Sequence, residues 1–177
     1  MPVVRLSFSG LFVWLGLLIL SAKIGLSYND QTYTLQTVVV LLMGAITGSF
    51  RAFMGVCIYL FLGKFFPVFN GPDYGTTVYS GYTTGYLLAF PFASLLAAKF
   101  NQAEWYWNCL VFFLIHLFIL VVGVLWLFQE KQLSFSAAWR FGFQAYLGFA
   151  LIKALLCSLL LYLYVYYENQ KIQSATN

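Results

Sequence analysis

The chain has 177 residues, of which 62% are hydrophobic, 21% aromatic and only 8% charged. Soluble domains carry about 25% charged residues, so this composition excludes an ordinary soluble protein and indicates an integral membrane protein. The formal net charge is +4, but the lysines and arginines are scattered along the chain without forming a patch, so no nucleic-acid partner is expected.

Apolar segments long enough to approach the thickness of a bilayer recur along the whole chain. A spanning helix needs about 20 apolar residues, and the alternation typical of barrel strands is missing. The expected fold is an all-α membrane protein with six transmembrane helices, forming a single transmembrane domain over residues 1–177. The predicted helices lie near residues 8–26, 34–50, 52–66, 78–99, 107–128 and 146–167.

The first and third segments each leave an alternative open. Arg5 followed by the apolar residues 11–20 resembles a secretory signal peptide, but the apolar run continues through Leu26 without a small-residue cleavage pattern, so a retained helix is expected. Arg51 leaves almost no loop before the third segment, which is short and could be tilted or partly re-entrant.

Polar residues open the second and fourth predicted helices and fill the loop at residues 67–75. Thr34, Gln36 and Thr37 begin the second helix, and a segment rich in tyrosine and threonine at 81–86 begins the fourth. An unsatisfied polar group in hydrocarbon costs several kcal/mol, so such segments persist only where protein or a water-filled cavity shelters them. The sequence therefore predicts the lining of a small-molecule pocket.

Helix direction predicts that these polar segments meet. Successive spanning helices alternate in direction, so the starts of the second, fourth and sixth helices face the same side as the 67–75 loop. Lys153 lies near the start of the sixth helix; its ammonium could snorkel to the membrane surface or pair with a ligand carboxylate, because no predicted span contains a carboxylate. The predicted ligand-binding residues are Thr34, Gln36, Thr37, Asn70, Tyr74, Thr84, Tyr86 and Lys153.

Other polar and small residues receive structural interpretations. His116 could relay protons, but a relay needs acidic companions at depth, so a hydrogen-bonded packing role is expected. The three cysteines lie in apolar runs and should remain unpaired. Glycine pairs 44/48 and 81/85 should let helices approach closely, and the polar tail 168–177 should fray. Phosphate-loop, nucleophile-elbow and zinc-helix motifs are missing, so no enzyme activity, cofactor or metal is expected.

Several motifs occur in the order typical of one family. They are Thr34-Leu35-Gln36-Thr37, Pro67-Val68-Phe69, Thr84-Gly85-Tyr86-Leu87-Leu88 with Phe90, and Leu151-Ile152-Lys153-Ala154. Over about residues 20–160 the chain resembles the BioY family, the biotin-specific S components of energy-coupling factor (ECF) transporters. The resemblance implies a multi-pass plasma-membrane subunit that captures biotin outside the cell. It also implies a membrane T subunit and two ATPase subunits as partners.

One difference from the family pattern keeps other functions open. The family usually has an aspartate three positions before the lysine, where this chain has Ala150, although Asp73 could substitute for it. The second hypothesis is therefore an S component for another small vitamin-like ligand. A third hypothesis is a structural subunit of a membrane complex that does not transport.

Overall fold

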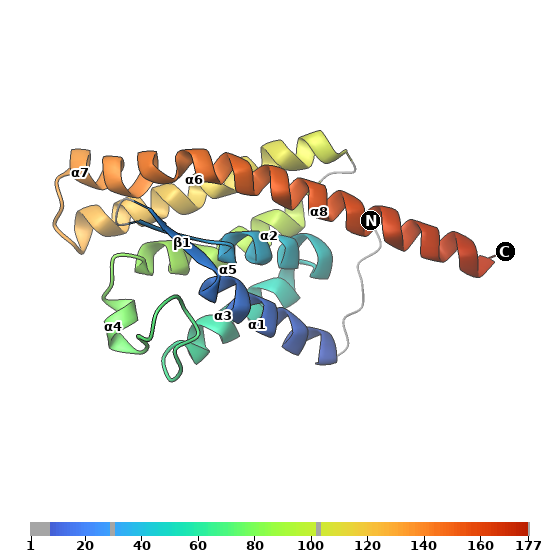
Figure 1. Ribbon diagram of the computed structural model, residues 1–177, viewed down its shortest axis with the longest axis horizontal. Coiled ribbons are helices and arrows are strands. Elements are labelled where there is room, and N and C mark those ends of the chain that lie inside the picture. The colour runs from blue at the N-terminus through green and yellow to red at the C-terminus, as the bar shows by residue number, and fades with distance from the viewer. Residues whose placement is uncertain (1–7, 29–30, 102–103, 177) are drawn as a thin grey trace.

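The computed structural model describes residues 8–28, 31–101 and 104–176, and Figure 1 shows it as an elongated bundle of helices with one small hairpin. The elements in chain order are α1 (Phe8–Lys23), β1 (Gly25–Tyr28), β2 (Gln31–Thr34), α2 (Gln36–Thr47), α3 (Ser49–Leu62), α4 (Thr76–Tyr79), α5 (Thr84–Phe100), α6 (Trp105–Gln129), α7 (Phe135–Trp139), the π-helical turn η1 (Arg140–Gln144) and α8 (Ala145–Thr176).

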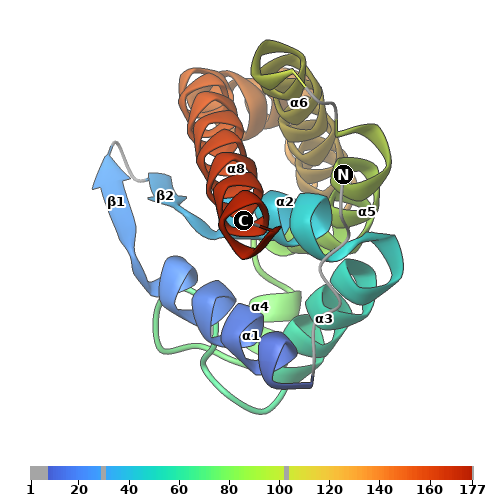
Figure 2. The same ribbon diagram turned by 90° about the vertical axis from the view of Figure 1, so that its right-hand side faces the viewer.

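Helix α2 occupies the centre of the bundle. It contacts α1, α3, α5 and α8, and in the end-on view of Figure 2 these helices and α6 surround it. Its side chains are apolar on almost every face, and Val40, Leu41 and Met43 are fully buried. A helix that is hydrophobic all round is stable only when other apolar surfaces cover it. The polar residues at the start of α2 therefore lie inside the protein.

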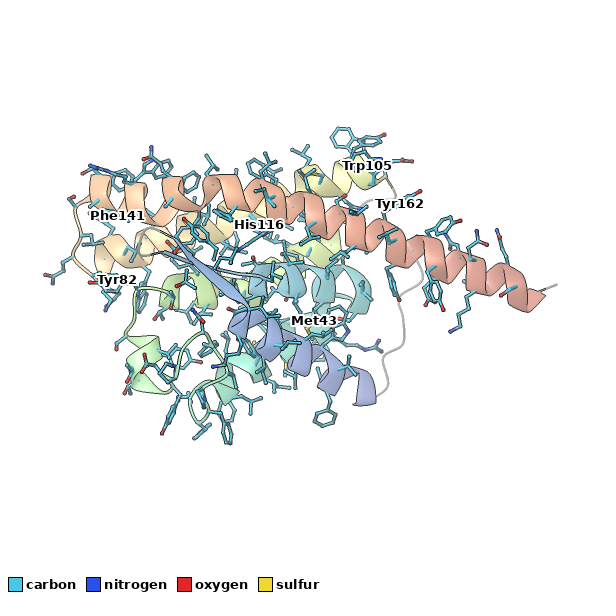
Figure 3. The ribbon with its side chains drawn as sticks, in the orientation of Figure 1. Met43, Tyr82, Trp105, His116, Phe141 and Tyr162 are labelled. Atoms are coloured by element: carbon cyan, nitrogen blue, oxygen red, sulfur yellow. The ribbon has the colours of Figure 1, made fainter. Side chains whose placement is uncertain are left out.

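The outer surface of the bundle fits a membrane. In the described part of the chain, Trp105–Gln129 and Phe135–Ser174 are long and apolar enough to cross a bilayer, whereas α1, α2, α3 and α5 are apolar but shorter. Aromatic residues gather at both ends, as Trp105 and Tyr162 at one end and Phe141 and Tyr82 at the other show (Figure 3). At 1.5 Å per residue, Phe141 and Tyr162 lie roughly 30 Å apart, about the thickness of the hydrocarbon core.

A β-hairpin replaces the expected start of the second helix. We predicted that this helix begins at Thr34, but β1 and β2 pair in antiparallel register, Gly25 with Thr34 and Leu26 with Tyr33, and α2 begins only at Gln36. Threonine and tyrosine favour strands, which explains the hairpin once a partner strand is available. The predicted all-α class holds for the bundle and omits this hairpin.

The fourth predicted helix, 78–99, is also shorter than expected. The short helix α4 ends at Tyr79, and α5 starts at Thr84. The carbonyl oxygen of Gly81, in the turn between them, accepts a hydrogen bond from Trp126 Nε1 at 2.9 Å. This bond holds the turn against α6 and satisfies a backbone group that the helix would otherwise use.

The prediction of a frayed tail is wrong for the described residues. Helix α8 continues through Glu168 as far as Thr176, and its end projects beyond the bundle in Figure 1. Glutamate, glutamine, lysine and alanine have good helix propensity, and extending an existing helix avoids the cost of nucleation. The basic start of the chain that contains Arg5 lies outside the described residues.

One glycine of each predicted pair lies at a close helix contact. A Cβ atom on Gly44 would lie 2.3 Å from the carbonyl oxygen of Ser94 on α5, and a Cβ on Gly85 would lie 2.3 Å from Cβ of Trp126 on α6. The other two glycines do not share these helix faces. Gly48 joins α2 to α3 with a φ of +87°, a backbone conformation that favours glycine.

Candidate ligand-binding cavity

A cavity of about 290 Å³ lies where the polar segments of the sequence meet. Its wall comes from β2, the starts of α2, α5 and α8, the loop before α4, and the middle of α6. The lining residues are Thr32, Thr34, Gln36, Thr37, Phe69, Asn70, Asp73, Thr77, Val78, Gly81, Thr83, Tyr86, Leu87, Phe90, His116, Ile119, Leu120, Tyr146, Ala150 and Lys153. Its volume is near the lower end of the roughly 300–1,000 Å³ typical of small-molecule sites.

Most of the residues predicted to bind ligand lie together in this wall, namely Thr34, Gln36, Thr37, Asn70, Tyr86 and Lys153. The structure places the other two elsewhere. Tyr74 is 54% exposed, on the loop after Asn70. Thr84 is buried, and its hydroxyl donates to the carbonyl oxygen of Val78 at 2.8 Å, so it stabilises the start of α5 from outside the cavity.

A chain of hydrogen bonds orients the amide of Gln36. The hydroxyl of Tyr59 donates to the carbonyl oxygen of Val68 at 3.1 Å, and Nε2 of Gln36 donates to the same hydroxyl at 2.9 Å. A hydroxyl has one hydrogen, which Val68 receives, so Tyr59 can only accept from Gln36. The amide oxygen of Gln36 is then the acceptor that this residue can offer to a ligand.

We expect the Tyr59→Phe substitution to destabilise the protein by about 1–3 kcal/mol, because it leaves buried polar groups of Gln36 and Val68 without their partner. Thermal unfolding of the detergent-purified protein measures this effect. Tyr162→Phe is the matched control, since Tyr162 is 51% exposed. Equal melting temperatures for the two variants would contradict the role assigned to the Tyr59 hydroxyl.

The β-hairpin is anchored to the start of α8. The hydroxyl of Tyr33 donates to the carbonyl oxygen of Ala145 at 3.1 Å, and its ring stacks on Phe149 with centroids 3.9 Å apart. Strand residues alternate in direction, so Thr32 and Thr34 face away from Tyr33. These anchors therefore bring the two threonines into the cavity wall.

The loop before α4 is held at two points. Nζ of Lys23 donates to the carbonyl oxygen of Gly71 at 2.7 Å, and the amide of Gly75 donates to the carbonyl oxygen of Gly63 at 2.9 Å. Gly75 has a φ of +66°, which a larger residue would adopt only with strain. Asp73 lies between these two anchors and Asn70 comes directly before the first, and both residues line the cavity.

Tyr86 is held as part of the wall by contacts at both ends of its side chain. Its hydroxyl donates to the carbonyl oxygen of Gly142 at 2.8 Å. A Cβ atom on Gly123 would lie 2.1 Å from the Tyr86 ring, so glycine at this position lets the ring approach α6. The phenol is thereby fixed in position and presents its ring to the cavity.

Lys153 is the only cationic side chain among the cavity-lining residues, and Asp73 is the only carboxylate. Lys153 is half-buried on α8 and makes no ion pair or hydrogen bond with another described residue. Asp73 is exposed on the loop across the cavity, and Ala150 is buried one turn before Lys153. The lysine therefore has its ammonium group available for an anionic or carbonyl group of a ligand.

Sequence reasoning missed the contribution of α6 to the cavity. His116, Ile119 and Leu120 line it from the middle of this helix. The hydrogen bond expected for His116 exists, because Nδ1 lies 2.8 Å from the carbonyl oxygen of Phe112 (Figure 3 labels His116). The signal in the sequence was a histidine in the middle of a long apolar helix, but the sequence did not show which face of the helix it occupies.

Two buried polar atoms have no hydrogen-bond partner among the described residues, and both belong to this cavity. They are Oγ1 of Thr37 and Nε2 of His116. A buried polar group without a partner costs about 1–3 kcal/mol, and nearly all such groups in proteins are satisfied. A polar ligand bound in the cavity would supply both atoms with the partner that the protein does not provide.

A second cavity, of about 400 Å³, adjoins the first. Both are lined by Thr32, Thr83, Tyr86 and Tyr146, so these residues form a shared wall. The second cavity also reaches Tyr82 and Phe141, which mark one end of the bundle in Figure 3. The ligand cavity therefore lies toward this end and not at the end marked by Trp105 and Tyr162.

Comparison with known proteins identifies the family. The model of the BioY family matches residues 3–168. This chain belongs to the BioY family. The BioY match includes all the motifs on which the resemblance in the sequence was based, and every residue that lines the cavity.

Relatives in the BioY family show how far the similarity extends. Biotin transporter BioY2 of Lactococcus lactis subsp. cremoris is 34% identical over 132 residues, which cover 71% of this chain and 71% of that protein. The probable biotin transporter BioY of Pyrococcus horikoshii is 30% identical over 155 residues, covering 87% of this chain and 91% of that protein.

A solved structure confirms the fold. The chain superimposes on the crystal structure of the S-component for biotin from an ECF-type ABC transporter with a TM-score of 0.75 and 19% sequence identity, covering 86% of both chains. The predicted S-component-like membrane bundle is therefore confirmed. The cysteines agree with the expectation too, since Cys57, Cys109 and Cys157 are all free.

Proposed function

We propose that this BioY-family chain is the substrate-binding membrane subunit that captures biotin and mediates its uptake together with an ATP-driven energy-coupling module. Biotin combines an apolar sulfur ring and aliphatic chain with a polar cyclic urea at one end and a carboxylate at the other. The cavity offers the same mixture, with apolar Leu87, Phe90 and Ile119 beside polar Gln36 and Lys153. Such a few polar groups in an apolar pocket give orientation and specificity to a bound ligand.

The observation that carries this proposal is the incomplete bonding of the cavity wall. Thr37 and His116 each present a buried polar atom without a protein partner, and the ammonium of Lys153 has no ion pair with a described residue. A ligand with several hydrogen-bond donors and acceptors would satisfy these groups together. The biotin named in the descriptions of the relatives and of the matched S component has this chemistry.

The assembly and location follow from the same proposal. We infer a single transmembrane domain over residues 1–177, located in the plasma membrane as a multi-pass protein whose cavity opens outward. Its partners would be a membrane T subunit and two ATPase subunits, which the family resemblance implies. The chain itself would bind and release the vitamin without catalysing a reaction. The residues predicted from the sequence would form the binding site, with Tyr74 and Thr84 in supporting positions around it.

Isothermal titration of the detergent-purified protein with biotin tests the proposal. We expect saturable binding with one site per chain and no comparable heat from riboflavin, thiamine or pantothenate. The sample is the unsubstituted protein, so this test does not depend on the folding of a variant. Saturable binding of one of the other vitamins, without binding of biotin, would contradict the biotin assignment.

One observation favours a second candidate ligand. Ala150 lines the cavity where the family usually has an aspartate, so this wall offers one acceptor fewer than the family pattern. Another small vitamin-like molecule with a different set of donors would suit such a wall. The titration series above separates the two ligands, because each predicts a different compound to produce the binding heat.

A further inference from the structure

His116 is a cavity residue whose hydrogen bonding the fold leaves half complete. The side chain is only 4% exposed and lies in the middle of α6. Nδ1 is 2.8 Å from the carbonyl oxygen of Phe112, one turn earlier on the same helix. Nε2 is buried and has no partner among the described residues, although the residue lines the cavity.

The bond to Phe112 determines what Nε2 can do. A carbonyl oxygen only accepts hydrogen bonds, so the hydrogen of the imidazole must be on Nδ1. A charged imidazole buried among apolar side chains would need an ionised partner, and within the described ranges no carboxylate forms an ion pair with His116. In the neutral ring Nε2 therefore carries a lone pair, and it is an acceptor.

Of the three residues of α8 that line this cavity, only Tyr146 has a side-chain oxygen atom that can accept a hydrogen bond. Ala150 and Lys153 on α8 line the same cavity, and α6 packs against α8. A methyl group cannot accept a hydrogen bond, and an ammonium group only donates. Among the α6 residues that line the cavity, His116 alone carries a side-chain acceptor, so a ligand N–H that lies against α6 beside Ala150 and Lys153 meets Nε2 of His116.

We propose that Nε2 of His116 binds biotin by accepting a hydrogen bond from an N–H of its cyclic urea. This inference rests on the proposed function and specifies how the site recognises the ligand. The cyclic urea has two N–H donors, and a donor that is buried without an acceptor loses its bond to water without replacement. His116 thereby selects for a ligand that carries a donor at this position.

Three substitutions separate the acceptor from the packing role. His116→Leu removes both hydrogen bonds, and His116→Asn can keep a donor near the Phe112 carbonyl but does not reach the cavity. His116→Gln places an amide oxygen near the position of Nε2. By isothermal titration we expect His116→Leu and His116→Asn to bind biotin about tenfold to a hundredfold more weakly, and His116→Gln to bind within a few fold of the unsubstituted protein.

Analogues of biotin methylated at one ureido nitrogen provide an independent test that does not depend on a variant folding. The unsubstituted protein should discriminate strongly against one of the two N-methyl isomers, and His116→Asn, checked for folding by its melting temperature, should discriminate less. Equal biotin affinity in the asparagine and glutamine variants, or equal discrimination against both isomers, would overturn the inference while leaving biotin capture intact. Failure of the unsubstituted protein to bind biotin would overturn both.

Discussion

Replacing Lys153 with methionine is expected to weaken biotin binding by about tenfold to a hundredfold, the effect of losing one charge-assisted hydrogen bond. The ammonium lines the cavity and makes no ion pair with a described residue, so an oxygen atom of the ligand is its expected partner. Methionine is close to lysine in length and retains the packing of the aliphatic chain. Isothermal titration of the purified variant measures the change.

Lys171→Met is the matched control for this experiment. Lys171 lies on the same helix, α8, but is exposed near its end and does not line the cavity. The Lys171→Met variant should bind biotin as tightly as the unsubstituted protein. This comparison separates a local effect at the site from a general effect of removing a positive charge. An unchanged affinity of Lys153→Met for biotin would contradict the placement of this lysine in the binding site.

The second large effect is expected from Gly44→Ala, which should destabilise the protein by about 1–3 kcal/mol or more. The added Cβ would lie 2.3 Å from the carbonyl oxygen of Ser94, so α2 and α5 would have to separate. Backbone atoms cannot move aside as a flexible side chain can. The measurement is thermal unfolding in detergent, together with the affinity for biotin, because the start of α2 carries Gln36 and Thr37.

Gly148→Ala provides the comparison for this substitution. A Cβ atom at Gly148, on α8, would have no heavy atom within 4 Å apart from its neighbours in the same stretch of helix. Alanine has better helix propensity than glycine by about 1 kcal/mol, so this variant should be neutral or slightly more stable. A melting temperature for Gly44→Ala equal to that of Gly148→Ala would contradict the close contact between α2 and α5.

The convergence of the polar segments could be predicted from the sequence, because this prediction depends only on the alternation of helix direction. Gln36, Asn70, Tyr86 and Lys153 are far apart in the chain, yet each stands out as a polar residue at the end of an apolar segment. In a membrane such residues need shelter, and the interior of the bundle provides it. This part of the prediction required no knowledge of side-chain contacts.

Other features depended on tertiary contacts that the sequence does not display. The hairpin formed by β1 and β2 is stabilised by Tyr33, which packs on Phe149 more than a hundred residues later. His116 faces the cavity because of the orientation in which α6 packs against α5 and α8. The nearly uniform apolar character of α6 did not indicate this orientation. Thr84 was assigned to the ligand although its hydroxyl serves the turn before α5.

A structure of the purified protein with biotin tests the central claim most directly. We predict biotin inside the cavity of about 290 Å³, with polar atoms within hydrogen-bonding distance of Lys153 Nζ and His116 Nε2. The ring and aliphatic chain should lie against Leu87, Phe90 and Ile119. Biotin bound at another surface, with this cavity filled only by water, would contradict the account.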